Sequence, residues 1–218
     1  MLDAEAILDF EKVLRPGPIA GRETKWDVPP LTASDREAVA GHRGSVVWFT
    51  GLSGSGKTTI AQLLDRRLLG FGKRSFLLDG DVMRTGITKG LGFSKEDREE
   101  NLRRFTEVAH LFAEAGVIAL VSAITPYEAV RERARQRVGT DRFVLVHVAT
   151  PLAVCEARDC KGLYKAARAG KIADFTGISS PYEEPVAPDL RLRVEDGDPP
   201  AQVDAVWRVL EQRGLLGR

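Results

Sequence analysis

Residues 51–58 carry the sequence pattern that most limits how this chain can fold. They read Gly-Leu-Ser-Gly-Ser-Gly-Lys-Thr and fit the phosphate-binding loop pattern G-x-x-x-x-G-K-[ST]. Residues 45–50 before them are apolar and β-branched, which predicts a buried strand, and residues 59–69 after them have apolar side chains at helical spacing. A glycine loop between a strand and a helix directs several backbone N–H groups at one point. The sequence therefore predicts a polyphosphate site.

Strand and helix patterns alternate along the rest of the chain. A long helix is expected from Ser94, with an Asp at the third position of a capping-box-like start, and a closing helix over residues 201–212. The further strands are expected at residues 74–78, 117–121, 143–148 and 190–194, the last of them at or near an edge. Repeated β-α units predict an α/β P-loop NTPase fold, in which a mostly parallel sheet has helices on both faces.

The bulk properties exclude several classes of protein. The formal net charge of +1 over 218 residues gives no general reason to expect nucleic acid or a membrane surface as partner. The N-terminus has no apolar signal core, and no apolar run reaches the ~20 residues that a membrane span requires. Cys155 and Cys160 are the only cysteines, and we expect reduced thiols and a cytoplasmic location. Residues 1–25 are interpreted as an N-terminal extension, which packs on the domain or on a partner subunit, and residues 26–218 as the nucleotide-binding domain.

The phosphate loop itself supplies the first candidate site residues. Lys57 is expected to reach the β- and γ-phosphates, and the Thr58 hydroxyl is expected to hold Mg²⁺. The ATP-binding set is Gly51, Leu52, Ser53, Gly54, Ser55, Gly56, Lys57, Thr58 and Thr59.

Two carboxylates, Asp79 and Asp81, follow the second expected strand. Ligands of parallel α/β sheets bind outside the carboxyl ends of the strands, so both side chains are expected beside the phosphate loop. One carboxylate can hold Mg²⁺ directly or through water, and we assign Thr58 and Asp79 to the metal. Another can orient the acceptor hydroxyl or take its proton, and the pattern leaves open whether this is Asp79 or Asp81.

Three further groups of polar residues are candidates. Arg98 and Asn101 lie three apart and share a helix face, which suits an acceptor with phosphate-like charge. The Thr125 hydroxyl, just before a proline, either contacts substrate or caps the next helix, and on sequence alone capping is favoured. The basic stretch of residues 158–168 is expected to form a lid over the transferring phosphoryl group; nucleic-acid binding is the weaker alternative.

Several strings outside the phosphate loop resemble those of the adenylylsulfate kinase (APS kinase) family, over about residues 24 to 213. They are Gly41-His42-Arg43-Gly44, Leu78-Asp79-Gly80-Asp81, Leu91-Gly92-Phe93-Ser94, the run from Asp97 to Arg104, Glu114-Ala115-Gly116, Cys155-Glu156-Ala157-Arg158-Asp159, Lys161-Gly162-Leu163-Tyr164-Lys165 and Phe175-Thr176-Gly177-Ile178.

The resemblance implies a P-loop kinase that converts ATP and adenosine 5′-phosphosulfate (APS) to PAPS and ADP in sulfate assimilation. It implies that Lys57, Asp79, Asp81 and Thr125 are catalytic, that Arg158 binds ATP, and that Phe93 and Phe175 sandwich the adenine of APS. The implied APS-binding set is Asp81, Arg84, Phe93, Arg98, Asn101, Ile124, Thr125, Lys161 and Phe175. It also implies Mg²⁺ as cofactor, a homodimer and a possible association with ATP sulfurylase.

Four positions in three segments depart from the family pattern near the acceptor. The family usually has Phe-Ile-Ser-Pro where this chain has residues 123–126 as Ala-Ile-Thr-Pro, and the resemblance implies that the family serine forms a phospho-intermediate in many members. Ser179 stands where an aspartate is usual, and Val82 where an asparagine is common. The alternatives are therefore a related kinase that phosphorylates the 3′-hydroxyl of another nucleotide derivative, or a nucleotide-binding scaffold for a sulfurylase.

Overall fold

A parallel five-stranded sheet organises the computed structural model, which describes residues 30–217. The strand order is β2-β3-β1-β4-β5, and each neighbouring pair is parallel. The strands are β1 (Ser45–Thr50), β2 (Ser75–Asp79), β3 (Ile118–Ser122), β4 (Phe143–Val148) and β5 (Leu190–Leu192). This confirms the expected α/β fold and the edge position of the last strand. The expected N-terminal extension of residues 1–25 and its boundary lie outside the described residues.

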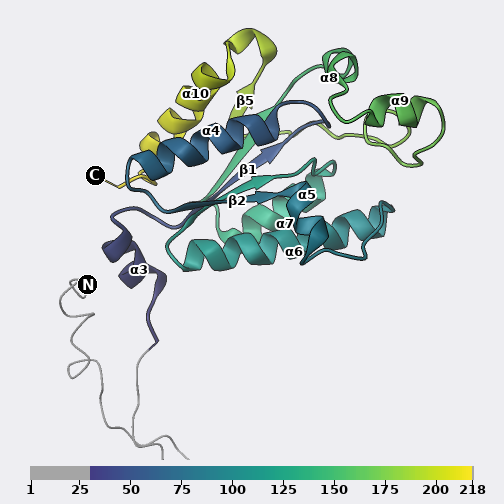
Figure 1. Ribbon diagram of the computed structural model, residues 1–218. Helices are drawn as coiled ribbons and strands as arrows, with labels where there is room; N and C mark the ends of the chain where they lie inside the picture. Colours follow the sequence, from purple (N-terminus) through teal and green to yellow (C-terminus); the bar gives the residue numbers. More distant parts are fainter. Residues whose placement is uncertain (1–29, 218) are drawn as a thin grey trace, which may run out of the picture.

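Helices cover both faces of the sheet, as Figure 1 shows. On one face lie α4 (Lys57–Gly70) and α10 (Pro199–Gln212), and on the other α6 (Lys95–Glu114) and α7 (Glu128–Val138). The shorter helices are α3 (Ala33–Ala40), α5 (Gly80–Thr85), α8 (Leu152–Arg158), α9 (Leu163–Arg168) and a 3₁₀ turn (Val194–Asp196). Among residues 30–217, no helix combines the length and the apolar character that crossing a membrane requires.

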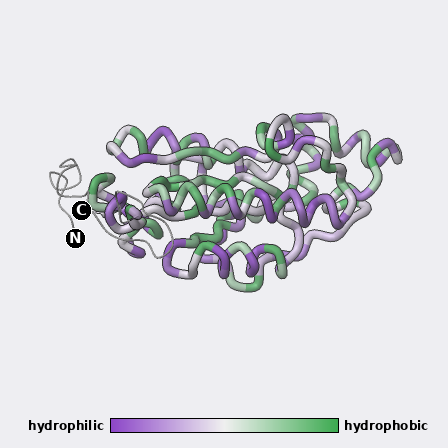
Figure 2. The backbone as a smooth tube through the Cα atoms, turned by 90° about the horizontal axis from the view of Figure 1, so that it is seen from below, coloured by the Kyte–Doolittle hydropathy of each residue, from purple (hydrophilic) through white to green (hydrophobic). Residues whose placement is uncertain are grey.

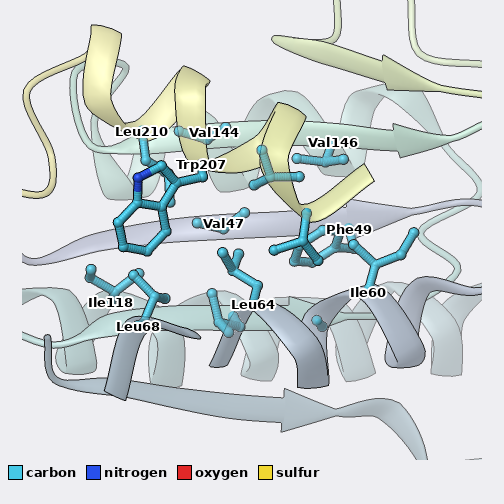
Figure 3. Close-up of a cluster of buried hydrophobic side chains, with 14 of the residues drawn as sticks. Val47, Phe49, Ile60, Leu64, Leu68, Ile118, Val144, Val146, Trp207 and Leu210 are labelled. Carbon is cyan, nitrogen blue, oxygen red and sulfur yellow. The ribbon is translucent and has the colours of Figure 1, made fainter. Parts of the chain in front are cut away.

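The central strands are buried on both faces, because helices cover each side of a parallel sheet. Successive side chains of β1 point to opposite faces. Val47 and Phe49 pack against α4 and α10, and Val46 and Trp48 pack against α6 and α7. Figure 3 shows the first of these clusters, with Trp207 of α10 over Val47. Figure 2 shows the hydrophobic strands inside and mixed, partly hydrophilic helices around them.

The long helix α6 begins where the sequence predicts. The Ser94 hydroxyl accepts a hydrogen bond from the Asp97 backbone N–H at 3.1 Å and so satisfies one of the free donors of the first turn. The buried face of the helix includes Leu102, Phe105 and Ala109. This helix therefore has one apolar face on the sheet and carries Arg98 and Asn101 in its first two turns.

Several element boundaries differ from the sequence prediction. β2 and β3 each begin and end one residue later than expected. The last strand ends at Leu192 rather than at residue 194, because the Arg193 N–H donates to the Asp196 carboxylate at 2.6 Å and the chain turns there. The first helix of the domain, α3, was not predicted; Thr32 and Asp35 form a capping box at its start.

Candidate active site

The phosphate loop joins β1 to α4 and approaches the end of β4 closely. Gly51 has a φ of 149°, and a Cβ placed there would lie 2.5 Å from the Val148 carbonyl oxygen and 2.9 Å from Ser55 Oγ. Gly56 (φ 105°) is the N-cap of α4. Glycine adopts left-handed or otherwise unusual backbone conformations more easily than any other residue does. The glycines of the sequence pattern therefore stand where the loop backbone needs such conformations, between β1 and the start of α4.

Lys57 lies inside the loop that it is expected to serve. Its Nζ donates to the carbonyl oxygens of Gly51 at 3.0 Å and Leu52 at 2.7 Å, and the residue is 8% exposed. Burial lowers the pKa of Lys57 to about 8, because the charged form loses its hydration. A buried ammonium held by two carbonyls and, at 3.4 Å, by Ser55 Oγ is well placed to exchange these neutral partners for phosphate oxygens.

This pKa predicts how nucleotide binding depends on pH. Phosphate binds the charged form of Lys57, so above pH about 8 the free protein must take up a proton when it binds MgADP. We expect a nearly constant affinity below pH about 7.5 and a fall of up to tenfold per pH unit above about 8. Calorimetry from pH 7 to 9.5, in two buffers of different ionisation enthalpy, measures both the affinity and the proton uptake. A Lys57→Met control should lack the proton uptake, and a wild-type protein without it would contradict this role.

An oxygen-rich cluster lies beside the loop. The Thr58 hydroxyl donates to Asp79 Oδ2 at 2.9 Å, and Ser122 Oγ lies 3.0 Å from Thr58 Oγ1. In the part of the chain that the structure describes, no group of three or more His, Cys, Asp or Glu could hold a metal. Hydroxyl and carboxylate oxygens with phosphate and water are, however, the ligands that Mg²⁺ prefers. Thr58 and Asp79 therefore fit the expected Mg²⁺. In such a site the protein supplies only one or two ligands, and phosphate and water supply the others.

Sequence reasoning missed Ser122 as a member of this cluster. It ends β3, which pairs with both β1 and β2, and so its hydroxyl lies between the phosphate loop and Asp79. The signal was present, because polar residues at the carboxyl ends of neighbouring parallel strands meet at one edge. The proline motif drew attention to Thr125, three residues later.

The two aspartates have different surroundings. Asp79 caps α5, where its Oδ1 accepts from the Asp81 backbone N–H at 2.9 Å while Oδ2 accepts from Thr58. Asp81 is exposed and forms an ion pair with Lys161 of the segment between α8 and α9. The structure thus joins Asp79 to the phosphate loop and Asp81 to the expected lid.

Arg98 connects two segments on the acceptor side. Its Nε donates to the Phe93 carbonyl oxygen at 2.8 Å, and its guanidinium also donates to the Asp174 carbonyl and the Thr176 hydroxyl. Arg84 lies over the Phe93 ring at 4.2 Å from its centroid. The structure brings together Arg84, Phe93 and Arg98, three of the residues expected to bind the acceptor.

Asn101 lies one turn further along α6. It is 8% exposed, and its Oδ1 has no hydrogen-bond partner within residues 30–217. A buried amide oxygen without a partner is costly in a folded protein unless a ligand or water satisfies it. The unpaired Asn101 amide oxygen therefore lies on the same helix as Arg98, where the sequence predicts acceptor-binding residues.

The expected lid packs on the phosphate loop through a small core of its own. Cys155, Tyr164, Ala167 and Phe175 form this core, with Leu52 of the loop packed against it. The Tyr164 hydroxyl donates to the Ser53 carbonyl oxygen at 2.9 Å. The lid is therefore in direct contact with the phosphate loop.

The two aromatic residues that are expected to sandwich the adenine differ in exposure. Phe175 is 8% exposed, and its ring meets the Tyr164 ring edge to face at 5.0 Å, whereas Phe93 is exposed. Arg158 is exposed at the end of α8.

Thr125 does not have the position that the sequence indicates. The N-cap of α7 is Tyr127, without a side-chain capping bond, so the favoured expectation that Thr125 caps this helix was wrong. Thr125 is 1% exposed, has a φ of 47°, and its Oγ1 accepts a hydrogen bond from Trp48 Nε1 at 2.8 Å. The structure therefore does not bring its hydroxyl together with Lys57 and Asp79. The Ile124 carbonyl, by contrast, contacts the start of the phosphate loop.

An open pocket of about 820 Å³ lies next to the loop. Leu52 and Leu152 line one side of it, and His147 and the residues that follow β4 line its floor. Segment 177–182 returns from the lid and forms another wall. Of residues 51–58 only Leu52 lines this pocket, so it extends from the carboxyl end of β4 beside the loop and does not include Lys57, Thr58 or Asp79.

Comparison with known proteins connects this geometry to one family. Residues 43–193 match the family described as adenylylsulphate kinase. An adenylyl-sulfate kinase of Shewanella amazonensis is 53% identical over 191 residues, which are 88% of this chain and 96% of the relative. The Mycobacterium tuberculosis APS kinase CysC, solved in complex with AMPPNP and APS, is 50% identical with a TM-score of 0.75, and the match covers 78% of this chain and 99% of that chain.

A second solved relative is larger than this chain. The hexameric APS kinase from Thiobacillus denitrificans is 30% identical with a TM-score of 0.63, and the match covers 85% of this chain and 31% of that chain. The family match covers the phosphate loop, the paired aspartates and the arginines on the expected acceptor side. The identity to the Shewanella relative extends over most of the chain. This chain belongs to the adenylylsulphate kinase family.

Proposed function

We propose that this chain transfers the γ-phosphoryl group of ATP to the 3′-hydroxyl of adenosine 5′-phosphosulfate, which gives PAPS and ADP in sulfate assimilation. The observation that carries the proposal is the hydrogen bond from Thr58 of the phosphate loop to Asp79, together with the ion pair of the nearby Asp81 with Lys161, because these contacts join the phosphate loop to residues expected on the acceptor side. The donor and acceptor groups then converge at one edge of the sheet.

On the donor side, the loop N–H groups and Lys57 bind the phosphates of ATP. Lys57 exchanges its two carbonyl partners for the β- and γ-phosphate oxygens and stabilises the charge that develops there during transfer. The lid core packs against Leu52 of the loop, and Arg158, exposed at the end of α8, is expected to contact the bound nucleotide. Excluding water from the loop strengthens each of these interactions.

On the acceptor side, the sulfated nucleotide binds between α6 and the lid. Arg98 and Arg84 provide positive charge for the phosphosulfate, and the buried Asn101 amide gains its missing hydrogen-bond partner. Phe93 presents an exposed ring for the adenine, and Phe175 borders the same space from the lid. Ile124 and Lys161 complete this side.

The surroundings of the two aspartates favour a division of roles. Asp79, which already bonds Thr58, would hold Mg²⁺ together with the Thr58 hydroxyl. When bound, Mg²⁺ neutralises negative charge on the phosphate oxygens. Asp81, which is exposed toward the lid, orients the acceptor hydroxyl and accepts its proton.

The departures from the family pattern have structural explanations that leave APS as the acceptor. Ser179 Oγ accepts a hydrogen bond from the Phe175 N–H at 2.9 Å, so it supports the lid turn as a carboxylate also could. Ala123 is 8% exposed and lies in the hydrophobic core around Trp48. Val82 is exposed. A kinase for a different 3′-hydroxyl nucleotide and a non-catalytic scaffold are therefore the alternatives for the test to exclude.

Release of ADP from MgATP tests the proposal. We expect fast release when APS is present, and much slower release with AMP as acceptor or with no acceptor. Release that is as fast with another nucleotide would favour the related kinase. Binding of ATP without turnover of any acceptor would favour the scaffold.

Substitution of Thr125 distinguishes direct transfer from a covalent route. Thr125→Ala removes the acceptor of the Trp48 indole N–H, so we expect unfolding to become easier by about 1–3 kcal/mol. Most of the turnover should remain, because the hydroxyl is buried in the core. Chemical denaturation and steady-state assays measure the two effects. Complete loss of turnover in a folded Thr125→Ala protein would support a phosphothreonine intermediate instead.

Location and assembly follow from the same proposal. Cys155 and Cys160 are free thiols, which suit the reducing, ATP-containing cytoplasm. Assembly as a homodimer and association with an ATP sulfurylase stay predictions from the family resemblance; the hexameric relative supports self-association in general.

A further inference from the structure

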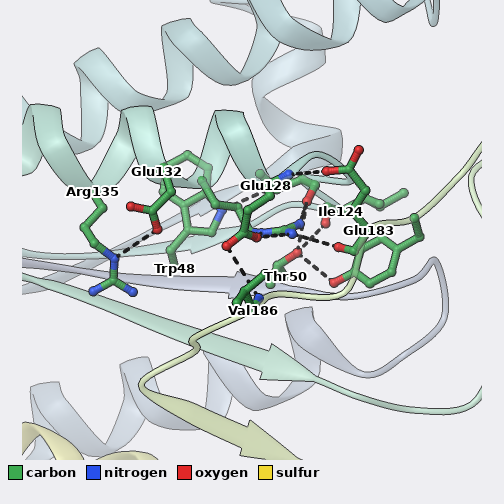
Figure 4. Close-up of polar contacts among 11 residues, drawn as sticks. Trp48, Thr50, Ile124, Glu128, Glu132, Arg135, Glu183 and Val186 are labelled. Atoms are coloured by element: carbon green, nitrogen blue, oxygen red, sulfur yellow. Dashed lines mark hydrogen bonds and ion pairs between the residues drawn. The ribbon is translucent and has the colours of Figure 1, made fainter.

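A fully buried arginine, Arg131 of α7, supports the turn that lies under the phosphate loop. The side chain is 0% exposed. Its Nε donates to Glu128 Oε2 at 2.8 Å, Nη1 donates to the Thr125 carbonyl oxygen at 2.6 Å, and Nη2 donates to the Glu183 carbonyl oxygen at 2.7 Å. One guanidinium thus connects α7, the turn of residues 123–126 and the segment that returns from the lid. Figure 4 shows the polar contacts in this part of the molecule, with Thr50, Ile124, Glu128 and Glu183 labelled.

The turn has a backbone conformation that needs support. Thr125 is β-branched and has a φ of 47°, in the left-handed region that such residues rarely adopt. Its carbonyl is held by Arg131 and its hydroxyl by Trp48 Nε1 at 2.8 Å. The conformation persists because the surrounding side chains fix it from two sides.

The turn of residues 123–126 also contacts Gly51, the first residue of the phosphate loop. The Ile124 carbonyl oxygen accepts from Thr50 Oγ1 at 2.6 Å and from the Gly51 N–H at 3.4 Å. Gly51 has no room for a shift toward β4, because a Cβ there would already collide with Val148. Arg131 is therefore separated from the loop by one turn only, since it bonds the Thr125 carbonyl and the adjacent Ile124 carbonyl bonds Gly51.

The returning lid segment is joined to the same cluster. Tyr182 Oη lies 3.0 Å from Thr50 Oγ1, and the Glu183 N–H donates to the Pro126 carbonyl oxygen at 2.8 Å. The lid, the turn and the end of β1 therefore share one set of hydrogen bonds.

We propose that Arg131 is a positioning residue, which holds the turn of residues 123–126 so that the phosphate loop and the acceptor side keep their relative placement. It contacts neither substrate in this arrangement and acts through the carbonyl groups of Thr125 and Glu183. This inference rests on the proposed function only where it concerns the acceptor; the effect on the phosphate loop concerns nucleotide binding alone.

The test compares Arg131→Lys with Arg135→Lys as a matched control. Arg135 lies one turn later on α7, is largely buried, and pairs with Asp189 at 3.0 Å and Glu132 at 3.6 Å rather than with the turn. Figure 4 shows it bonded to Glu132 at the edge of the cluster. Both variants should lower the melting temperature. Only Arg131→Lys should lower kcat by about tenfold or more and weaken MgADP binding by about threefold to tenfold.

A double-mutant cycle gives a readout that general destabilisation does not produce. Thr50→Val removes the hydroxyl that bonds the Ile124 carbonyl, and we expect its effect on kcat to be non-additive with Arg131→Lys but additive with Arg135→Lys. If Arg131→Lys does not fold, Thr50→Val and Tyr182→Phe replace it, and each should lower kcat by about fivefold.

Each outcome decides the matter. A folded Arg131→Lys protein with kcat and MgADP affinity within twofold of the wild type overturns the proposal, as do equal losses in the Arg135→Lys control. Wild-type activity in Thr50→Val and Tyr182→Phe overturns it as well. If the wild-type protein does not phosphorylate APS, the proposed function fails, and the MgADP affinities of the same variants still test the positioning role.

Discussion

Replacing Lys57 with alanine is expected to reduce phosphoryl transfer by at least about 10²–10³-fold, because the developing phosphate charge loses its buried cationic partner. The fold should survive, since burial already disfavours the charged form of this lysine and lowers its pKa to about 8. Steady-state release of ADP in the presence of APS measures the loss, and circular dichroism checks the fold.

Lys73→Ala is the matched control for this variant. Lys73 stands at the amino end of β2, opposite the site, where its Nζ donates to the Gly41 carbonyl oxygen at 3.2 Å. Its removal should leave turnover unchanged. If Lys57→Ala retained turnover within about threefold of the wild type, the role of Lys57 in charge stabilisation would be wrong.

Gly51→Ala is expected to cause the second large effect, on both stability and nucleotide binding. The new Cβ would lie 2.5 Å from the Val148 carbonyl oxygen, so either the end of β4 or the phosphate loop must move. Overpacking and the unfavourable φ together should lower the free energy of unfolding by about 2–5 kcal/mol. MgADP binding should fall below detection, because the loop N–H groups lose their common direction.

Gly54→Ala separates the collision from the backbone cost. Gly54 also has a positive φ, of 73°, but the nearest atom to its added Cβ is the Cys155 carbonyl oxygen at 3.5 Å. We expect a loss of only about 1–2 kcal/mol there. Urea denaturation compares the two variants, and equal losses would show that the contact with β4 is not what limits residue 51.

Much of this architecture could be predicted from the sequence because its signals are local. The apolar run of β1, the glycine loop and the helical spacing of α4 each determine a short segment, and the rule for parallel sheets then places Asp79 beside Thr58. The phosphate loop and the start of α6 were therefore expected where they occur.

The remaining features depend on contacts between distant parts of the chain. Thr125 has a hydroxyl before a proline, which is typical of a cap, but Trp48 binds that hydroxyl from 77 residues away. Ser122 joins the phosphate loop only because β3 lies between β1 and β2. The role of Arg131 arises from two carbonyl groups, whose positions no residue pattern specifies. Exact strand ends also depend on single hydrogen bonds such as that between Arg193 and Asp196.

The central claim is that one site binds MgATP and a sulfated adenylate with its 3′-hydroxyl facing the γ-phosphate. Incubation of the protein with MgATP and APS, followed by ³¹P NMR of the products, tests it most directly. We predict equal amounts of ADP and of an adenylate that carries a new phosphate monoester on its 3′-oxygen, and none with the 3′-deoxy analogue of APS. ADP formed without that monoester, or formed equally with the 3′-deoxy analogue, would contradict the claim.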